Sequence, residues 1–337
     1  MACTKKLDSF ELTFGIRAAT CRVYAGLLIA FLLGAVPSEA SESFQGVFAT
    51  QSLVFSEGSP TEVSSPAYRS VPLESTETQV RYRTLGAYAA GVTALAVYAN
   101  KNWWGDGFEG EFRSVDEGWF GQDTRHGGTD KLGHGFANYV GTRLFARAFE
   151  WAGNDEKTSL RLAVGSVLGT FTVVEILDGF TTRWKFSAED AIMNALGAGL
   201  AVVMETSPQL DRLLDFRLLY KPSGDSSRRF DPFGDYSGQT YLLAAKASGV
   251  PGLRERGALR YIELAVGYGT RGYQLDQNVS GDRSRNVYYG VSINLAELLD
   301  QTVFRGSARK SPAQRAVNGF LEVVQVPGTA ALTHQRQ

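Results

Sequence analysis

The feature that most constrains the fold of this chain is a series of three long apolar segments separated by short polar breaks. Residues 130–151, 159–178 and 188–206 have the length and composition of α-helices. A Gly-Asn pair at 153–154 separates the first segment from the second. Short connections join helices that pack antiparallel, and an Ala-rich run at 84–100 precedes the series, so we expect a bundle of about four helices.

The chain changes character after this bundle. Residues 240–247, 260–268 and 286–295 alternate apolar and polar side chains with the two-residue period of β-strands. Three strands are too few to close a barrel, so they either form a small antiparallel sheet or add to a larger one. The sequence therefore predicts an α+β fold, in which an apolar helical bundle is followed by a small antiparallel β unit.

The N-terminus has the pattern of an export signal. Arg17 and Arg22 flank the start of an apolar run at 23–36, and Ser38 and Ala40 supply small residues at the two cleavage positions. The apolar run is too short for a comfortable membrane span, so cleavage after Ala40 is the main interpretation and an uncleaved anchor is the alternative. The sequence thus predicts export to the cell envelope, in the periplasm and associated with a membrane.

Composition excludes two classes of site. The net charge is −1 and no long basic run occurs, so nucleic acid is not an expected partner. Cys3 and Cys21 both lie in the signal, so the mature chain would have no disulfide and no thiolate metal site. The predicted parts are a signal peptide (1–40), a disordered Ser/Thr/Pro/Glu-rich linker (41–78), the helical bundle (79–220), antiparallel strands (236–300) and a C-terminal helical tail (301–337).

The polar motifs of the three central helices lie at ends that antiparallel packing would bring together. Each helix carries polar residues three or four positions apart, which places them on one stripe. These residues are Asp130, His134 and Asn138, with Lys131 beside them; Glu175 and Asp178; and Asp190 and Asn194. The surrounding residues are apolar or small, and buried ionisable groups are costly, so we expect one cluster that forms a functional site.

Glu175 and Asp178 most clearly require a partner. They occupy the last turn of a helix, where the helix dipole is negative, so the pair calls for a nearby cation. Lys131, Arg183 and Lys185 are cations within the chain, and a divalent metal is the alternative. Candidate metal ligands are Asp130, His134, Glu175, Asp178 and Asp190. This oxygen-rich set suits magnesium, calcium or manganese better than zinc, but the sequence favours internal salt bridges over a metal.

Simpler interpretations stay open for several of these positions. Asp130 or Thr129 can be a helix N-cap, His134 a structural histidine and Asn194 an interhelical hydrogen-bonding residue. Ser187 begins a capping pattern in which Asp190 reaches back to the helix start. The remaining structural positions are Gly165 and Gly169, at the spacing of close helix contacts, Gly179 as a C-terminal cap, and Gly197.

Membrane association of the bundle has evidence on both sides. The segment 159–178 is apolar, and all five tryptophans (103, 104, 119, 151 and 184) fall at or between helix ends. Against a full span, Arg143 and Arg147 lie within the first helix. The last helix has only fourteen uncharged residues between Asp190 and Glu205. An embedded or peripheral bundle and a soluble helical core both remain open.

The runs EGWFGQDTRHGGTDKLGHGFANYVGTR, EILDGFTTRWKFSAEDAIMNALGAG, DYSGQTYLLA and RNVYYGVSINL resemble the YfiM-like family of predicted bacterial envelope proteins, whose function is unknown. The resemblance covers roughly residues 80–330. The Asp-Lys…His and Asp…Asn…Gly parts resemble, more weakly, the VanZ-like membrane proteins linked to glycopeptide resistance. The first resemblance implies export and membrane association. Many members are lipoproteins, whereas this chain lacks a suitably placed lipid-attachment cysteine. The matching motif positions are Asp130, Lys131, His134, Glu175, Asp178, Gly179, Ser187, Asp190, Asn194 and Gly197.

Three functional hypotheses follow. The leading one is a structural or ligand-binding envelope protein, because no nucleophile elbow, P-loop or metalloprotease helix occurs. The second is an enzyme acting on a lipid-linked or cell-wall substrate. In it Lys131 and Arg183 hold an anionic group and His134 and Glu175 exchange protons, with or without a divalent metal. The third is an accessory subunit that docks on an outer-membrane protein through Tyr268, Tyr273, Tyr288 and Tyr289. Membrane lipid and an envelope protein are the expected partners.

Overall fold

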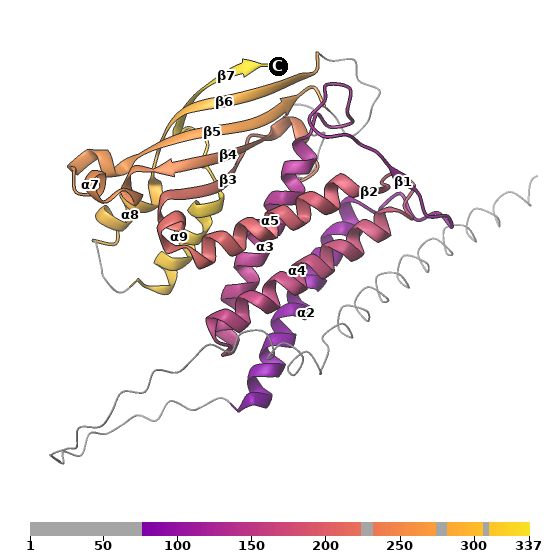
Figure 1. The fold of residues 1–337 in the computed structure, drawn as a ribbon, viewed down its shortest axis with the longest axis horizontal. Helices are drawn as coiled ribbons and strands as arrows, with labels where there is room; N and C mark the ends of the chain where they lie inside the picture. The colour runs from indigo at the N-terminus through magenta and orange to yellow at the C-terminus, as the bar shows by residue number, and fades with distance from the viewer. Residues whose placement is uncertain (1–75, 224–231, 274–281, 306–309) are drawn as a thin grey trace, which may run out of the picture.

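The computed structural model describes residues 76–223, 232–273, 282–305 and 310–337 (Figure 1). The predicted signal peptide, and the predicted linker up to residue 75, lie outside these residues. Four long helices lie on one side of a five-stranded antiparallel sheet. The predicted α+β class is therefore confirmed. The long helices are α2 (Glu77–Asn102), α3 (Thr129–Ala152), α4 (Glu156–Asp178) and α5 (Ala188–Thr206).

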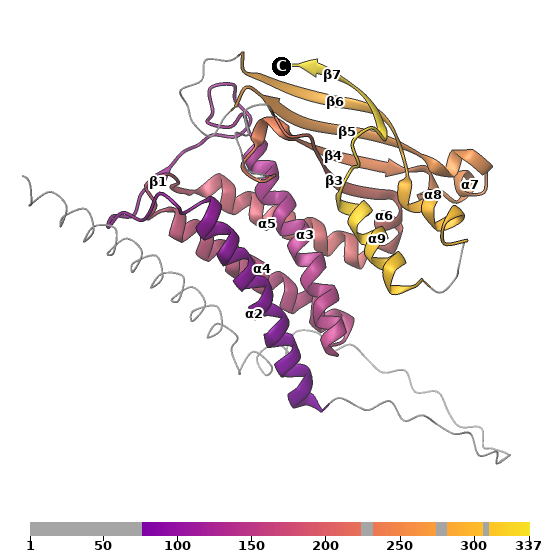
Figure 2. The same cartoon turned by 180° about the vertical axis from the view of Figure 1, so that it is seen from behind.

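Helix α3 is the centre of the helical layer, because it packs against each of α2, α4 and α5 (Figure 2). It begins after Gly128, with φ of 86°, and ends before Gly153, with φ of 113°; glycine reaches this left-handed region without steric cost. The Asp155 side chain caps α4 by accepting the N–H of Thr158. The short turns bring the start of α3, the end of α4 and the start of α5 to one end of the layer.

The closest approach in the helical layer is between α3 and α5 at Gly135 and Gly197. A Cβ atom on Gly197 would overlap the carbonyl oxygen of Gly135. Gly197 therefore sets the spacing of the two helices that carry most of the polar cluster. Gly199, two residues farther along α5, is exposed, and a Cβ atom added to it would meet nothing within 4 Å.

We expect the substitution Gly197→Ala to lower the free energy of unfolding by about 1–3 kcal/mol, because the helices must separate to admit the methyl group. Chemical denaturation followed by circular dichroism measures this change. Gly199→Ala is the matched control and should be neutral, or stabilising by about 0.5–1 kcal/mol, because alanine favours a helix over glycine. Equal stability of the two variants would contradict the close packing.

Two other glycines differ from their predicted roles. Gly165 and Gly169 are exposed, and a Cβ atom on either would meet nothing within 4 Å, so the expected interhelical contact is absent from the described part of the chain. The reason is that α4 turns its opposite stripe, which includes Ala163 and Val174, toward the other helices. Gly179 does follow α4, but with a right-handed φ of −57°. Its lack of a side chain instead makes room for the ring of Phe112.

The five sheet strands follow one another in chain order, each antiparallel to the next. They are β3 (Leu214–Tyr220), β4 (Gln239–Lys246), β5 (Ile262–Arg271), β6 (Ser284–Ile293) and β7 (Ala330–Arg336). The shorter elements are β1 (Ser114–Val115) and β2 (Phe186–Ser187), α6 (Pro208–Leu213), α7 (Pro251–Arg254), α8 (Leu295–Thr302), α9 (Pro312–Val323) and the 3-10 turns η1 (Tyr236–Gly238), η2 (Ala247–Gly249) and η3 (Gly257–Tyr261).

The sheet is larger than predicted because two strands lie in segments assigned to helices. β3 falls inside the predicted helical bundle, where the run LDFRLLY fits both a helical and a strand pattern. β7 falls inside the predicted helical tail; it is an exposed edge strand held by its ladder with β6. The prediction of helix throughout 301–337 is therefore wrong for residues 330–336, whereas α9 agrees with it. Most of α8 lies before this tail, in the segment 236–300 that was predicted to hold strands.

One face of the sheet is only partly covered. Tyr241, in contact with Phe136 of α3 and Phe216 of β3, belongs to the covered part. Because alternate residues of a strand share a face, the apolar residues farther along belong to this same face. There Leu243, Ile262, Leu264, Val266, Tyr289, Val291 and Ile293 are exposed. The helices thus cover one end of the apolar sheet face and leave the other end open.

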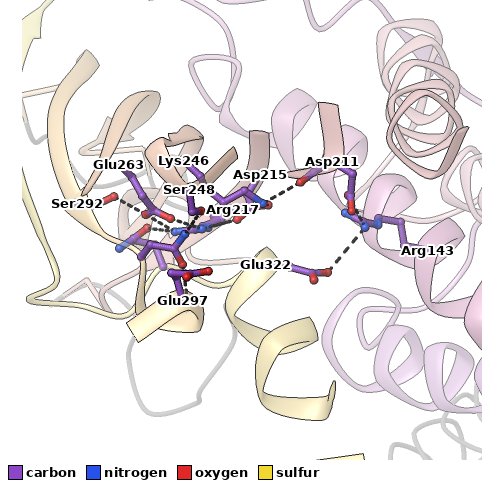
Figure 3. Close-up of polar contacts among 12 residues, drawn as sticks. Arg143, Asp211, Asp215, Arg217, Lys246, Ser248, Glu263, Ser292, Glu297 and Glu322 are labelled. Atoms are coloured by element: carbon purple, nitrogen blue, oxygen red, sulfur yellow. Dashed lines mark hydrogen bonds and ion pairs between the residues drawn. The ribbon is translucent and has the colours of Figure 1, made fainter. Parts of the chain in front are cut away.

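The opposite face carries a buried ion-pair network (Figure 3). The Arg217 guanidinium donates to both oxygens of Glu263, at 2.7 and 2.8 Å, and also pairs with Asp215. Lys246 donates to the other oxygen of Asp215, and Ser292 donates to Glu263. Two cations meet two carboxylates here. The network is balanced in charge, so we interpret it as structural.

A second buried arginine joins the helices to the end of the chain. Arg143 of α3 donates to Glu205 of α5 at 2.6 Å and to Asp211 of α6 at 2.7 Å. It also lies 3.8 Å from Glu322 of α9 (Figure 3). Arg147 contacts the same glutamate at 2.9 Å. The charges of Arg143 and Arg147 are therefore matched within the protein.

Candidate functional site

The first part of the polar cluster surrounds the Lys131 ammonium group. Its Nζ atom lies 2.6 Å from Glu117 Oε2, 3.0 Å from Asp130 Oδ2 and 2.9 Å from Asp190 Oδ1. Lys131 is only 1% exposed. Burial alone would lower its pKa, but Asp130, Asp190 and Glu117 raise the pKa above its usual value. The lysine is therefore a buried cation enclosed by three carboxyl groups.

This geometry differs from the role that the enzyme hypothesis gave Lys131. An ammonium group has three N–H donors, and three carboxylates already surround it. Glu117 and Asp130 accept hydrogen bonds from it, and Asp190 is an ion-pair partner at 2.9 Å, so the charge of Lys131 is matched within the protein. Spacing does not predict the contact with Glu117, because this residue lies in the aperiodic segment before α3.

The second part of the cluster centres on His134. Its Nδ1 atom lies 3.1 Å from Glu175 Oε1 and 3.2 Å from Asn194 Oδ1, while Nε2 lies 3.9 Å from Asp190 Oδ2. Burial opposes the charged form, but Asp190 and Glu175 raise the pKa of His134 to about 10. The imidazole is therefore protonated at neutral pH. Asn138 completes this part by donating to Asn194 Oδ1 at 2.5 Å.

Asp178 lies beside this cluster with a different partner. Its Oδ1 atom accepts the indole N–H of Trp104 at 2.6 Å. Burial raises the pKa of Asp178 to about 8, opposed by the Trp104 hydrogen bond and reinforced by Glu175. Most of this carboxyl is thus neutral at pH 7. Arg183, the cation predicted to balance it, instead lies 3.7 Å from Asp106 and over the ring of Trp184.

The simpler interpretations of these positions have mixed outcomes. The N-cap of α3 is Gly128, without a side-chain hydrogen bond, and Thr129 Oγ1 contacts Thr270 Oγ1 at 2.8 Å. Asp130 and Thr129 are therefore not caps. Ser187 does cap α5 by accepting the N–H of Asp190 at 3.3 Å. The Asp190 carboxylate does not reach back to the helix start but pairs with Lys131.

Two groups of ligand atoms lie close enough to hold a metal ion within the described residues. His134, Glu175 and Asp190 form the first, and Glu117, Asp130 and Asp190 form the second, each with ligand atoms within 4.8 Å of one another. Lys131 Nζ contacts all three members of the second group and occupies its centre. The first group is therefore the better metal candidate, and Asp178 belongs to neither.

A cavity of about 210 Å³ opens above the cluster. Its walls are mainly aromatic and apolar, and its acidic and basic side chains are Asp130, His134 and Asp178. Its lining consists of Leu95, Tyr98, Trp103, Asp130, Gly133, His134, Ala137, Phe171, Val174, Asp178, Trp184, Phe233 and Tyr236. An apolar concavity with a few convergent polar groups is the usual form of a small-molecule site. Spacing does not predict the cavity, because Tyr98 and Trp103, at the end of α2, lie far along the chain from Tyr236.

His126 lies behind one wall of this cavity. It is 2% exposed, and its ring stacks on Tyr236 with centroids 4.0 Å apart. Burial holds its pKa well below the usual value, so the imidazole is neutral. Neither ring nitrogen has a hydrogen-bond partner among the described residues. Its role is therefore to pack against the aromatic wall.

One family model matches part of the chain. Residues 116–206 match a family described as predicted periplasmic lipoprotein (DUF2279). This segment contains both parts of the polar cluster and Asp178, whereas the five-stranded sheet lies outside it. The match confirms the predicted location: the protein is exported and belongs to the cell envelope. No curated protein and no solved structure matches the chain.

Proposed function

We propose that this envelope protein binds a small, mainly apolar ligand in the cavity between α2, α3 and α4. The observation that carries the proposal is that the cavity and the polar cluster share two residues, and that a third lining residue lies beside the cluster. Asp130, His134 and Asp178 line the cavity and also belong to, or lie beside, the buried cluster. The apolar walls would provide affinity, and these three side chains would orient the ligand.

The enzyme hypothesis is the second candidate, with its roles revised. His134 is protonated at neutral pH, so it would act as an acid and not as a base. Asp178 lines a mainly apolar cavity and has a pKa of about 8, so it would be able to exchange a proton near neutral pH. A divalent metal at His134, Glu175 and Asp190 would displace the imidazole proton and supply Lewis-acid chemistry instead.

Membrane association is part of the proposal. Among the described residues, α4 alone is long and apolar enough to cross a membrane, a criterion that the core helix of a soluble protein also meets. Several large apolar side chains of α4 and α5 are exposed, namely Ile176, Ile192, Leu196 and Val203. We propose that this surface contacts lipid, and that the motif resemblance to the YfiM-like and VanZ-like families reflects a related membrane-associated role.

The accessory-subunit hypothesis retains only part of its original basis. Tyr268 donates its hydroxyl hydrogen to the carbonyl of Gly127, and Tyr273 donates to that of Gln122. The hydroxyl groups of these two tyrosines are engaged within the protein, which does not favour them as docking residues. Tyr289 is half exposed, on the open apolar face of the sheet. That face would be the contact surface if an envelope protein bound this chain.

We expect the substitution Ala137→Phe to weaken binding of a neutral aromatic probe, because the added ring fills the cavity that Ala137 lines. Indole is a suitable probe, and its dissociation constant can be measured by calorimetry or ligand-observed NMR. A loss of affinity of about tenfold or more is expected. Ala195→Phe, at an exposed position of α5, adds the same ring outside the cavity and should leave binding unchanged. Equal binding to both variants would refute the cavity as the site.

A further inference from the structure

We infer that the ligand of this cavity carries an ammonium group on an apolar stem. The inference rests on the proposed function and adds the chemical class of the ligand. Its basis is the combination of an aromatic wall, which includes Tyr98, Trp103 and Tyr236, with two carboxyl groups, Asp130 and Asp178, in one cavity. Aromatic rings and carboxylates together are the groups that recognise organic cations.

The charges at this end of the helices are unequal in number. Among the buried and half-buried side chains that surround Lys131, His134 and Asp178, the acids are Glu117, Asp130, Glu175, Asp178, Glu189 and Asp190, and the cations are Arg125, Lys131 and His134. Arg183 is matched separately by Asp106. Asp178 is mostly neutral at pH 7, and the five other acids still exceed the three cations. A cationic ligand would offset part of this excess, whereas an anionic ligand would add to it.

The cations already present are committed to protein groups. Lys131 contacts three carboxyl groups, and His134 lies between Glu175 and Asp190. His134 is therefore the one cation in the cavity lining. Its charge is matched by Glu175 and Asp190, which do not line the cavity. An anionic ligand would find no unmatched cation in this lining.

Asp178 has hydrogen-bonding capacity left for a ligand. One of its oxygens accepts the Trp104 indole, and the other has no hydrogen bond from any described residue. The ring of Trp184 already attracts cations, since the guanidinium carbons of Arg125 and Arg183 lie 4.9 and 5.3 Å from its centroid. An ammonium group in the cavity would therefore meet a carboxyl oxygen and aromatic faces together.

The test compares three probes that share one apolar stem and differ in charge: n-hexylammonium, 1-hexanol and hexanoate. Calorimetry on the full chain at pH 7 gives each dissociation constant. We expect hexylammonium to bind at least about tenfold more tightly than hexanol, and hexanoate to bind most weakly. A bound ammonium group would favour the ionised form of Asp178, and asparagine cannot ionise. Asp178→Asn keeps the shape of the side chain, so it should remove most of the hexylammonium preference without changing hexanol binding. Glu111→Gln, at an exposed acid before α3, is the matched control and should have no effect.

The possible results distinguish the ammonium inference from the proposal that the cavity binds a ligand at all. Equal affinity for hexanol and hexylammonium, or a preference for hexanoate, would overturn the ammonium assignment while leaving a ligand cavity. Failure of all three probes and of indole to bind would overturn both.

A preference for ammonium has two sources, a lipid headgroup or a free amine. Vesicles of phosphatidylethanolamine and of phosphatidylglycerol, compared through tryptophan fluorescence with and without Asp178→Asn, test the lipid. Ethanolamine in solution tests the free amine. A response to either that depends on Asp178 supports the inference.

Discussion

Replacing Lys131 by methionine should lower the free energy of unfolding by about 3–5 kcal/mol, because it leaves buried carboxylates without their cation. Glu117, Asp130 and Asp190 all lie within 3.0 Å of the Lys131 ammonium nitrogen, and Asp130 and Asp190 are themselves nearly inaccessible to water. Methionine has an unbranched apolar side chain that is one atom shorter than that of lysine, so the substitution keeps most of the stem and removes the charged ammonium group. Denaturant titration at neutral pH, followed by far-ultraviolet circular dichroism, measures the change.

Lys185→Met is the matched control, since Lys185 is exposed near the same end of the helices. It should change stability by no more than about 0.5 kcal/mol. A double variant, Lys131→Met with Asp190→Asn, should be less destabilised than the sum of the two single variants, because each removes part of the same charge imbalance. A Lys131→Met protein as stable as the control would mean that the three carboxyl groups do not depend on the lysine, and the cluster would lose its physical basis.

Replacing Arg217 by methionine should have an effect of similar size, about 3–5 kcal/mol, in a different part of the protein. Arg217 is 3% exposed and holds both oxygens of Glu263, which would otherwise keep only the hydroxyl of Ser292 (Figure 3). Asp215 is less affected because Lys246 also pairs with it. The same denaturant titration measures the loss, and Arg254→Met, at an exposed position of α7, is the control.

The Arg217 variant also separates the two buried networks. The residues that line the cavity come from the helices and their loops and from the segment just before β4, and none belongs to the Arg217 network. Under conditions where the variant is folded, indole should therefore bind as it does to the unsubstituted protein. A large loss of indole affinity would show that the sheet network and the cavity are coupled, and the purely structural interpretation of the Arg217 network would then be wrong.

Several features of the candidate site follow from spacing alone. Asp130, His134 and Asn138 recur every four residues, and a helix places such residues on one stripe. The short connections on either side of α4 require antiparallel neighbours, so the end that carries Glu175 meets the end that carries His134. Ser187 precedes α5 with the side chain that a helix N-cap needs. Each of these inferences depends only on local backbone geometry.

Other features depend on which surfaces meet, and spacing does not encode that. Gly165 and Gly169 have the separation of a close helix contact, yet the structure turns their side of α4 outward. The run LDFRLLY suits a helix or a strand, and its pairing with β4 decides between them. Glu117 and Trp104 come from loops without periodicity, so their contacts with Lys131 and Asp178 appear only in the folded chain.

The sequence alone determined that acids, a lysine and a histidine share one end of a set of apolar helices, because helical period and short turns are local properties. Only the tertiary structure decided which charge faces which, and that an aromatic cavity lies above them. The physical reason is that ion-pair and burial energies change steeply over a few ångströms, and those distances are set by residues far apart in the chain.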